Sequence, residues 1–181
     1  MRVNPPLHVA LIGFMGCGKS TVGPLLAKQL GARFVDTDAL IVADAGGRTI
    51  PTIFAEEGEA AFREREARQI ASICDSPEPV VIATGGGAIL RTENVACLRG
   101  SASVVWLTAR PDVVVARTLR DRNRPLLAGA QTREERHARV LSLIGERGPH
   151  YQAAAHLIVD TSDRSPLSIA REIERKVLKN R

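Results

Sequence analysis

Eight residues near the amino terminus have the types and the spacing that a bound phosphate chain requires. The segment GFMGCGKS, residues 13–20, matches the pattern G-x-x-x-x-G-K-[ST] in full and lies between an apolar run and a helix-like stretch. Its glycines let successive backbone N–H groups converge, and a helix start adds partial positive charge. We expect Lys19 to reach the β- and γ-phosphates of a nucleotide and the Ser20 hydroxyl to hold Mg²⁺. The alternative is a glycine-rich turn between core elements, which the complete pattern disfavours.

Two aspartates follow the second apolar run, in the segment FVDTDALI. Asp36 and Asp38 are two residues apart, so in an extended chain both carboxylates would point the same way. One can orient Mg²⁺-bound water, and the other can accept a proton from an attacking hydroxyl. Neither this segment nor the glycine-rich one contains histidine, so a general base here must be a carboxylate. The alternative is that Asp38 caps the next helix, and the phosphate-binding pattern favours chemistry.

Alternating apolar runs and helix-like stretches surround these residues. Buried strands are predicted at residues 7–12, 33–36, 80–83, 103–107 and 156–159. Helices are predicted at residues 20–30, 38–45, 59–73, 92–98 and 132–146, with others starting at Pro111 and at Ser165-Pro166. This alternation indicates an α/β fold in which helices cover both faces of a parallel sheet. Ligands of such sheets bind at the carboxyl ends of the strands.

Three features interrupt this regular pattern. Pro24 lies inside the first helix, where we expect a kink or the loss of one backbone hydrogen bond. Thr49 followed by Pro51 predicts a capped helix start, which Gly58 interrupts soon afterwards. The segment RDRNRPLLAGAQ, residues 120–131, is basic and lacks an apolar period, so it predicts a mobile loop.

The overall composition limits the class of partner. The chain has 181 residues, 44% of them apolar and 25% charged, which suits a single globular domain. Its formal net charge of +5 suits anionic ligands. The arginines are dispersed and only one tryptophan and one tyrosine are present, so small anions fit better than nucleic acid. No apolar stretch approaches the length of a membrane span, and the first apolar run makes a poor signal peptide.

The cysteines and histidines match no metal-binding pattern. Cys17, Cys74 and Cys97 are odd in number, which suits reduced thiols in a cytoplasmic protein. Cys17 occupies a variable position of the glycine-rich segment, where a small residue fits, and a thiol near a helix N-terminus can have a lowered pKa. No motif contains any of the four histidines, which are His8, His137, His150 and His156.

Seven segments together resemble those of the shikimate kinase family. In chain order they are GFMGCGKST, FVDTD, IFAEEGEAAFRERE, ATGGGAIL, RNRPLL, ERGPHY and VDTSDRSP, and the resemblance covers nearly the whole chain. It implies a P-loop fold of the nucleoside-monophosphate-kinase type, with three layers, α/β/α, around a five-stranded parallel sheet. It also implies a single domain over residues 1–181, a substrate-binding segment at about residues 36–70, a mobile lid at about residues 120–131, and a monomer. The implied reaction converts ATP and shikimate to ADP and shikimate 3-phosphate.

The resemblance also implies roles for individual residues. Lys19, Asp38 and Arg124 would be catalytic, with Arg124 neutralising charge from the lid, and Mg²⁺ would bind near Ser20 and Asp36. The implied ATP site contains Gly13, Met15, Gly16, Cys17, Gly18, Lys19, Ser20, Thr21, Arg117, Arg124 and Arg164, where Arg117 and Arg164 flank adenine. The implied shikimate site contains Asp38, Phe54, Phe62, Arg63, Gly85, Gly86, Gly87 and Arg147.

These implied roles make chemical sense, and each has an alternative. Shikimate carries a carboxylate, which a guanidinium from Arg63 or Arg147 can bind with two hydrogen bonds. Glu66, one helical turn from Arg63, could hold that guanidinium in place, although such a spacing is also common in ordinary exposed ion pairs. The two phenylalanines could be core residues, and Arg117, Arg164 and the lid arginines could be solvated. A related small-molecule kinase, such as a gluconate kinase, and a non-catalytic nucleotide-binding module are the alternative functions.

Overall fold

The computed structural model describes residues 7–118 and 132–179, and its centre is a sheet of five parallel strands. The strands are β1 (His8–Ile12), β2 (Arg33–Asp36), β3 (Val80–Ala83), β4 (Ala102–Thr108) and β5 (Leu157–Asp160). Their order across the sheet is β2-β3-β1-β4-β5, so β1 is central and β2 and β5 form the edges. The predicted α/β fold with a parallel five-stranded sheet is confirmed.

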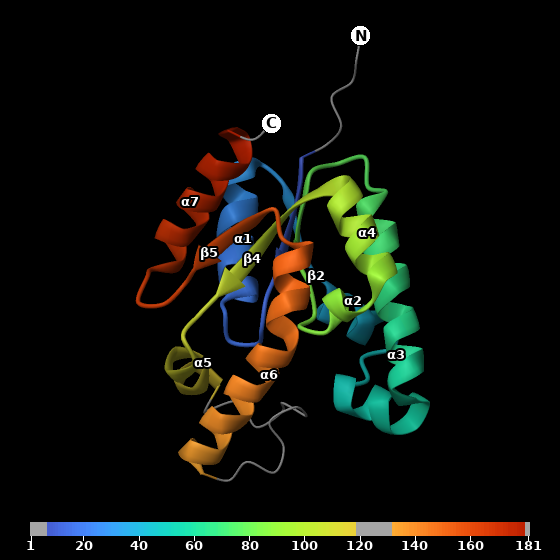
Figure 1. Cartoon of the computed structure of the whole chain (residues 1–181). Coiled ribbons are helices and arrows are strands. Elements are labelled where there is room, and N and C mark those ends of the chain that lie inside the picture. Colours follow the sequence, from blue (N-terminus) through green and yellow to red (C-terminus); the bar gives the residue numbers. More distant parts are fainter. Residues whose placement is uncertain (1–6, 119–131, 180–181) are drawn as a thin grey trace.

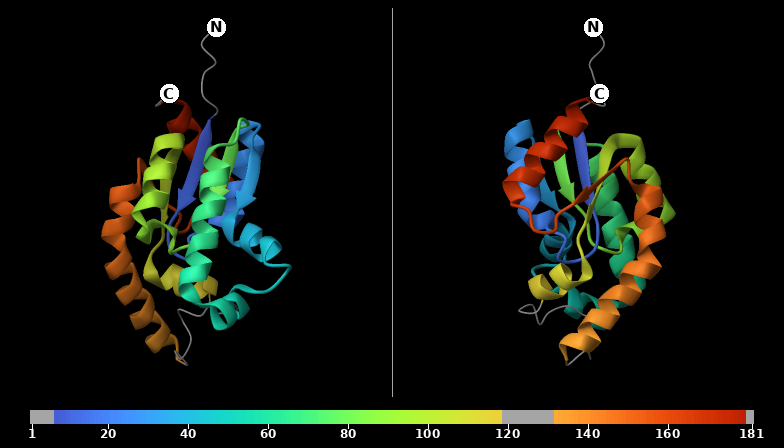
Figure 2. Two further views of the ribbon diagram at one scale, coloured as in Figure 1. Left: turned by 90° about the vertical axis from the view of Figure 1, so that its right-hand side faces the viewer. Right: turned by 60° about the vertical axis from the view of Figure 1, so that its left-hand side comes forward.

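Helices cover both faces of this sheet (Figures 1 and 2). One face packs against α1 (Lys19–Leu30) and α7 (Pro166–Lys179), and the other against α3 (Ile50–Cys74), α4 (Thr92–Ser101) and α6 (Arg133–Ala154). The inner strands β1 and β3 are buried along their whole length, which explains why they are continuous apolar runs rather than alternating ones. The remaining elements are α2 (Thr37–Asp44), α5 (Pro111–Thr118) and a 3₁₀ turn, η1 (Ala88–Leu90).

Residues 37–74 form a lobe beside the sheet, made of α2 and α3 (Figure 1). Thr49 caps α3 as predicted, because its hydroxyl accepts a hydrogen bond from the Thr52 N–H at 3.3 Å. Gly58 then breaks α3 with φ 83° and ψ 168°, a conformation available to glycine and strained for other residues. A small cluster of Ile41, Ile53 and Phe62 with its neighbours gives this lobe its own apolar centre.

Two sequence predictions about helices need correction. The helix predicted to end at Glu146 continues to Ala154, because Tyr151 and Ala154 on its last turns are buried against the sheet. Asp38 does not cap α2: Asp36 is the N-cap, its Oδ1 accepting the Asp38 N–H at 3.0 Å, and Asp38 lies in the first turn. The remaining predicted helices and strands are present with small shifts of their ends, and α1 continues through Pro24 as one helix.

Two further findings concern the predicted membrane and lid properties. Among residues 7–118 and 132–179, no helix is both long enough and apolar enough to cross a lipid bilayer. The predicted lid segment, with Arg124, lies outside the residues that the structure describes.

Candidate active site

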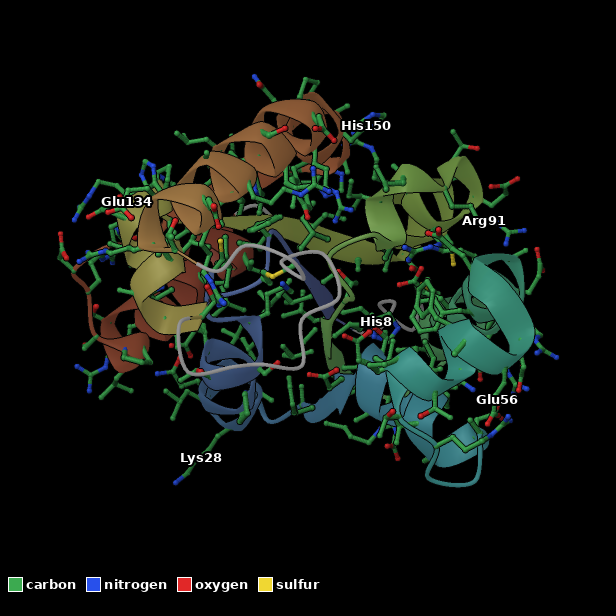
Figure 3. All side chains as sticks on the ribbon, turned by 90° about the horizontal axis from the view of Figure 1, so that it is seen from below. His8, Lys28, Glu56, Arg91, Glu134 and His150 are labelled. Atoms are coloured by element: carbon green, nitrogen blue, oxygen red, sulfur yellow. The ribbon has the colours of Figure 1, made fainter. Side chains whose placement is uncertain are left out.

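The loops that follow β1, β2 and β3 meet at the carboxyl edge of the sheet, which Figure 3 views from below. The loop after β1 carries the glycine-rich segment, β2 leads directly into α2 with its two aspartates, and β3 leads into Gly85–Gly87. Parallel strands bring their carboxyl ends to one edge, so residues far apart in sequence come together here. Two cavities open at this edge, and they share Met15, Asp38 and Gly86.

The glycine-rich loop has the backbone conformation that a phosphate-binding loop requires. Gly13, Gly16 and Gly18 have φ values of 141°, 77° and 95°, which other residues rarely adopt. At Gly13 a Cβ atom would also collide with the Leu107 carbonyl oxygen, so this residue lets the loop turn against β4. The Lys19 ammonium donates to the carbonyl oxygens of Gly13 at 2.7 Å and Phe14 at 3.1 Å, which holds its charge over the loop.

The first cavity, of about 460 Å³, lies above this loop and the start of α1 and is called the donor cavity below. It brings together most of the residues predicted for ATP, namely Met15, Gly16, Cys17, Gly18, Lys19, Ser20, Thr21, Arg117 and Arg164, with Asp36 and Asp38. Gly13 does not line it and instead supports Lys19 from behind. The lining also includes residues that the sequence did not single out for ATP: Val22, Thr84, Thr161, Pro166 and Ile169.

At the far end of the donor cavity, hydrogen bonds hold the two arginines predicted to flank adenine. Arg117 donates to the Gly16 carbonyl oxygen at 3.1 Å and to the Thr161 carbonyl oxygen at 2.9 Å. Arg164 donates to the Asp160 carbonyl oxygen at 3.1 Å and forms a 2.6 Å ion pair with Glu172. Thr161 also donates to the Cys17 carbonyl oxygen at 3.1 Å, so the loop after β5 supports the glycine-rich loop directly. For this loop after β5, the sequence signal was the segment VDTSDRSP as a whole.

Ser20 and Asp36 lie together beside the glycine-rich loop. The Ser20 hydroxyl donates to Asp36 Oδ2 at 2.8 Å, while Asp36 Oδ1 caps α2. A hydroxyl and a carboxylate at this spacing fit Mg²⁺, which binds through few protein oxygens and completes its shell with phosphates and water. The described residues contain no cluster of three or more histidine, cysteine or acidic side chains, so a site held by the protein alone does not fit.

Cys17 differs from the expectation that its thiol has a lowered pKa. The side chain is 2% exposed and packs in the core between the sheet and α1. Burial raises the pKa of this thiol, and the opposing effects of Lys19 and Arg117 are smaller. Cys17 is therefore a small apolar core residue whose backbone, rather than its sulfur, belongs to the loop.

The second cavity, of about 230 Å³, lies between the lobe and the sheet and is called the acceptor cavity below. It brings together every residue predicted for shikimate: Asp38, Phe54, Phe62, Arg63, Gly85, Gly86, Gly87 and Arg147. The rest of the lining consists of Met15, Ile50, Pro51, Glu59 and Glu66. The rings of Phe54 and Phe62 have their centroids 4.7 Å apart and form an apolar wall, and the Arg63 guanidinium lies 5.2 Å from the Phe62 centroid.

Arg63 is held in this cavity by two glutamates. It forms a 2.8 Å ion pair with Glu66 and a 3.1 Å ion pair with Glu59. The Glu66 side chain is 1% exposed, and burial raises its pKa, opposed by Arg63. This is not the ordinary exposed helix pair of the sequence alternative, because Glu66 is fully enclosed and its Oε1 has no hydrogen-bond partner. A buried carboxylate leaves the guanidinium one preferred orientation.

Two members of the triple glycine, Gly85 and Gly87, approach charged groups more closely than a Cβ atom allows without a shift. A Cβ on Gly85 would lie 2.7 Å from Glu66 Oε1 and 2.8 Å from Asp38 Oδ1, and one on Gly87 would lie 2.6 Å from Arg63 Nη2. The Gly86 carbonyl oxygen accepts hydrogen bonds from the Tyr151 hydroxyl at 2.6 Å and from Arg147 at 3.3 Å. Tyr151 is a site residue that sequence reasoning missed, because its hydroxyl acts on a backbone atom 65 residues away.

Comparisons with known proteins agree with this geometry. A family model described as shikimate kinase matches residues 15–178. A shikimate kinase of Pseudomonas syringae pv. tomato is 47% identical, with 92% of this chain and 93% of the relative covered. One of Symbiobacterium thermophilum is 44% identical, with 94% and 96% covered.

Solved structures agree as well. A shikimate kinase from Acinetobacter baumannii in complex with shikimate has a TM-score of 0.88 and 37% identity, with 97% of this chain and 95% of that chain covered. A gluconokinase from Sinorhizobium meliloti, at 20% identity and a TM-score of 0.52, shares the fold alone. With a family model over most of its length and near-complete relatives well above 40% identity, this chain belongs to the shikimate kinase family.

Proposed function

We propose that this shikimate kinase transfers the γ-phosphate of ATP from the donor cavity to the 3-hydroxyl of shikimate in the acceptor cavity. The observation that carries the proposal is that Asp38 and Gly86 line both cavities, at the place where the two substrates would meet. A bond would form between the shikimate 3-oxygen and the γ-phosphorus as the bond to the β-γ bridging oxygen breaks. The products would be shikimate 3-phosphate and ADP.

In the donor cavity, the backbone N–H groups of the glycine-rich loop would bind the phosphates, with Lys19 neutralising charge on the β- and γ-phosphates. Arg117 would lie against one face of adenine, since its guanidinium is already fixed by the loop and Thr161. Arg164 and Pro166 would form the opposite side of that subsite. Met15, which also lines both cavities, would separate the nucleotide from the acceptor ring.

Ser20 and Asp36 would hold Mg²⁺ together with ATP. Bound Mg²⁺ would supply charge neutralisation on the β- and γ-phosphate oxygens. Ser20 would contribute its hydroxyl oxygen directly, and Asp36 would orient that hydroxyl and water, since its other oxygen is engaged in capping α2. The same carboxylate thus joins the start of α2 to the start of α1.

In the acceptor cavity, Arg63 and Arg147 would bind the shikimate carboxylate, while Phe54 and Phe62 would face the ring. Asp38 would accept the proton that the 3-hydroxyl loses, since its carboxylate lies where the two cavities join. Gly85, Gly86 and Gly87 would let the backbone lie against the ring, and side chains at Gly85 and Gly87 would also crowd Glu66, Asp38 and Arg63.

Other parts of the proposal rest on the family resemblance alone. They are that Arg124 acts from a mobile lid at about residues 120–131, that about residues 36–70 form the substrate-binding segment, and that residues 1–181 form one domain. The same holds for a monomer, while the expectation of a cytoplasmic enzyme without nucleic-acid or membrane partners comes from the cysteines, the composition and the apolar runs. Each is a prediction about this chain and needs its own measurement.

The test of the proposed function is a coupled assay of ADP release with and without shikimate in the presence of Mg-ATP. We expect release to depend on shikimate and to saturate with it. Gluconate at the same concentrations serves as the control acceptor, because it has a carboxylate and hydroxyls but no ring to lie against Phe54 and Phe62. Turnover with gluconate alone, or no turnover with either acceptor, would contradict the proposal.

A further inference from the structure

The width of the acceptor cavity depends on the break in α3. Before Gly58, residues 50–57 form a short arm, and after it residues 59–74 form a long arm. The cavity takes Ile50, Pro51 and Phe54 from the short arm and Phe62 and Arg63 from the long arm. The angle between the arms therefore sets the distance between Phe54 on the short arm and the Arg63 guanidinium on the long arm.

The backbone at the break does little to fix this angle. Gly58 has φ 83° and ψ 168°, so the regular helical geometry stops there. A Cβ atom added to Gly58 would meet no heavy atom within 4 Å beyond the adjacent backbone. No close packing therefore holds the glycine itself. The Phe54–Phe62 contact crosses the break, but ring contacts are compatible with a range of angles.

Four charged side chains form a network at the break, and none of them lines the cavity. Glu57, the last residue of the short arm, accepts hydrogen bonds on both oxygens from Arg65 of the long arm, at 3.0 Å and 3.3 Å. Arg65 also forms a 2.8 Å ion pair with Asp44 at the end of α2. Arg48, from the loop between the helices, forms a 2.6 Å ion pair with Glu57 and donates to the Ala45 carbonyl oxygen at 3.0 Å.

This network of Asp44, Arg48, Glu57 and Arg65 differs from ordinary surface ion pairs. The side chains of Glu57 and Arg65 are 24% and 21% exposed, so water screens their attraction only in part. The Glu57–Arg65 contact is bidentate, which fixes direction as well as distance. Both arginines hold the pKa of Glu57 below its ordinary value, Arg65 more strongly than Arg48, so the carboxylate stays charged at neutral pH.

We propose that Glu57 is a positioning residue for the acceptor: through Arg65 and Arg48 it fixes the angle between the arms of α3 and so sets the affinity for shikimate. This inference rests on the proposed function for the identity of the acceptor. Glu57 touches neither substrate in this scheme. It acts through the placement of Phe54 relative to Arg63.

Glu57→Gln in the full chain tests the proposal, because it keeps the size of the side chain and removes its charge. We expect the KM for shikimate to rise about fivefold, as charged hydrogen bonds across the break are weakened. The KM for ATP and kcat should stay within about twofold of the wild type. The matched control is Glu56→Gln: Glu56 is the neighbouring glutamate, lies at the outer rim in Figure 3, and forms a 2.9 Å ion pair with Arg48 that does not cross the break.

A second measurement on the same proteins keeps the test independent of turnover. Amide hydrogen exchange in the absence of substrates should become faster over residues 50–57 in Glu57→Gln than in Glu56→Gln or the wild type. An unchanged KM for shikimate would overturn the proposal, and so would unchanged exchange, or an equal loss in both KM values together with a lower melting temperature. If the wild type fails to phosphorylate shikimate, the proposed function falls, and the exchange comparison still decides whether Glu57 holds the arms.

Discussion

The donor and acceptor cavities are built in contrasting ways. Residues 15–22, one continuous segment, provide much of the donor cavity. The acceptor cavity takes its walls from α2, both arms of α3, the loop after β3, and α6. A phosphate chain can be bound by N–H groups of one loop, whereas a ring with a carboxylate needs side chains from several directions.

The difference extends to what supports each cavity. In the donor cavity, Lys19 and Arg117 are held by carbonyl oxygens of the same loop. In the acceptor cavity, Arg63 depends on buried Glu66, and the Gly86 carbonyl depends on Tyr151. Damage to the donor cavity should therefore affect phosphoryl transfer itself, while damage to the acceptor supports should appear first in the KM for shikimate.

The largest effect is expected from Lys19→Ala. Removing the ammonium leaves the charge of the transferring phosphoryl group without its neighbour in the loop, and kcat should fall by at least about 1000-fold. The coupled ADP-release assay measures this. Lys28→Ala is the control, because Lys28 lies on the same helix, is exposed, and projects away from the site in Figure 3. Near-normal turnover of Lys19→Ala would break the contrast between the cavities.

A smaller and more selective effect is expected from Gly87→Ala. The added methyl group would lie 2.6–2.9 Å from the Arg63 guanidinium and push it off its position. The displaced guanidinium would lose a charged hydrogen bond to the shikimate carboxylate, a loss of about 2 kcal/mol, so the KM for shikimate should rise about 30-fold with little change for ATP. Gly100→Ala in α4, where a Cβ meets nothing within 4 Å, is the control. Equal changes in both KM values would show that the cavities are not separately supported.

Tyr151→Phe should lower kcat/KM for shikimate by about tenfold at most, because the variant loses one buried hydrogen bond. The ring stays in place against Trp106, with which it stacks at 5.6 Å between centroids, and only the bond to the Gly86 carbonyl is lost. Since Gly86 also lines the donor cavity, a smaller change in the KM for ATP is expected. Steady-state kinetics with each substrate varied in turn would measure both. A change confined to ATP would contradict the assignment.

The smallest effect concerns the amino edge of the sheet, opposite both cavities. His8 Nδ1 accepts the Val80 N–H at 3.2 Å, and His156 Nδ1 accepts the Val104 N–H at 3.0 Å. Burial lowers the pKa of both imidazoles from 6.5. The folded protein therefore binds these protons less readily than the unfolded chain, and stability is lost as pH falls below 6.5.

Melting temperatures measured from pH 8 to pH 5 would show this loss, because this interval spans the ordinary histidine pKa of about 6.5. His8→Asn should reduce the pH dependence, because the amide oxygen can accept the same hydrogen bond without titrating. Both KM values should match the wild type at pH 8, since this edge supports neither cavity. If the stability of His8→Asn depended on pH as steeply as that of the wild type, His8 would not be a source of this pH dependence.

The same contrast explains how much could be predicted from sequence. The donor loop is a continuous motif, so Lys19, Ser20 and their neighbours could be assigned from spacing alone. The acceptor residues Arg63 and Arg147 needed a family resemblance, since their convergence depends on the packing of α3 and α6. Tyr151 escaped notice because the helix was predicted to end at Glu146, whereas it continues through Gly148 and Pro149. The burial of the last turns against the sheet outweighs the tendency of glycine and proline to end a helix. This burial cannot be predicted from the local sequence pattern.

The sequence also left the two aspartates ambiguous for a physical reason. Capping and metal binding both favour a carboxylate at the junction of β2 and α2, so residue type alone cannot separate them. In the structure Asp36 caps with one oxygen and contacts Ser20 with the other, while Asp38 faces both cavities. Capping and contact with Ser20 are therefore both made by Asp36. Asp38, in the first turn of α2, is left to face the cavities.

The stack of Trp106 on Tyr151 has an optical consequence. Trp106 is the single tryptophan of the chain, and the ring it touches carries the hydroxyl that holds the Gly86 carbonyl between the cavities. Indole emission responds to its immediate surroundings, so a ligand that shifts this loop should change the fluorescence of the unmodified protein. Equilibrium affinities for each substrate could then be read from intrinsic emission, without a label and without turnover.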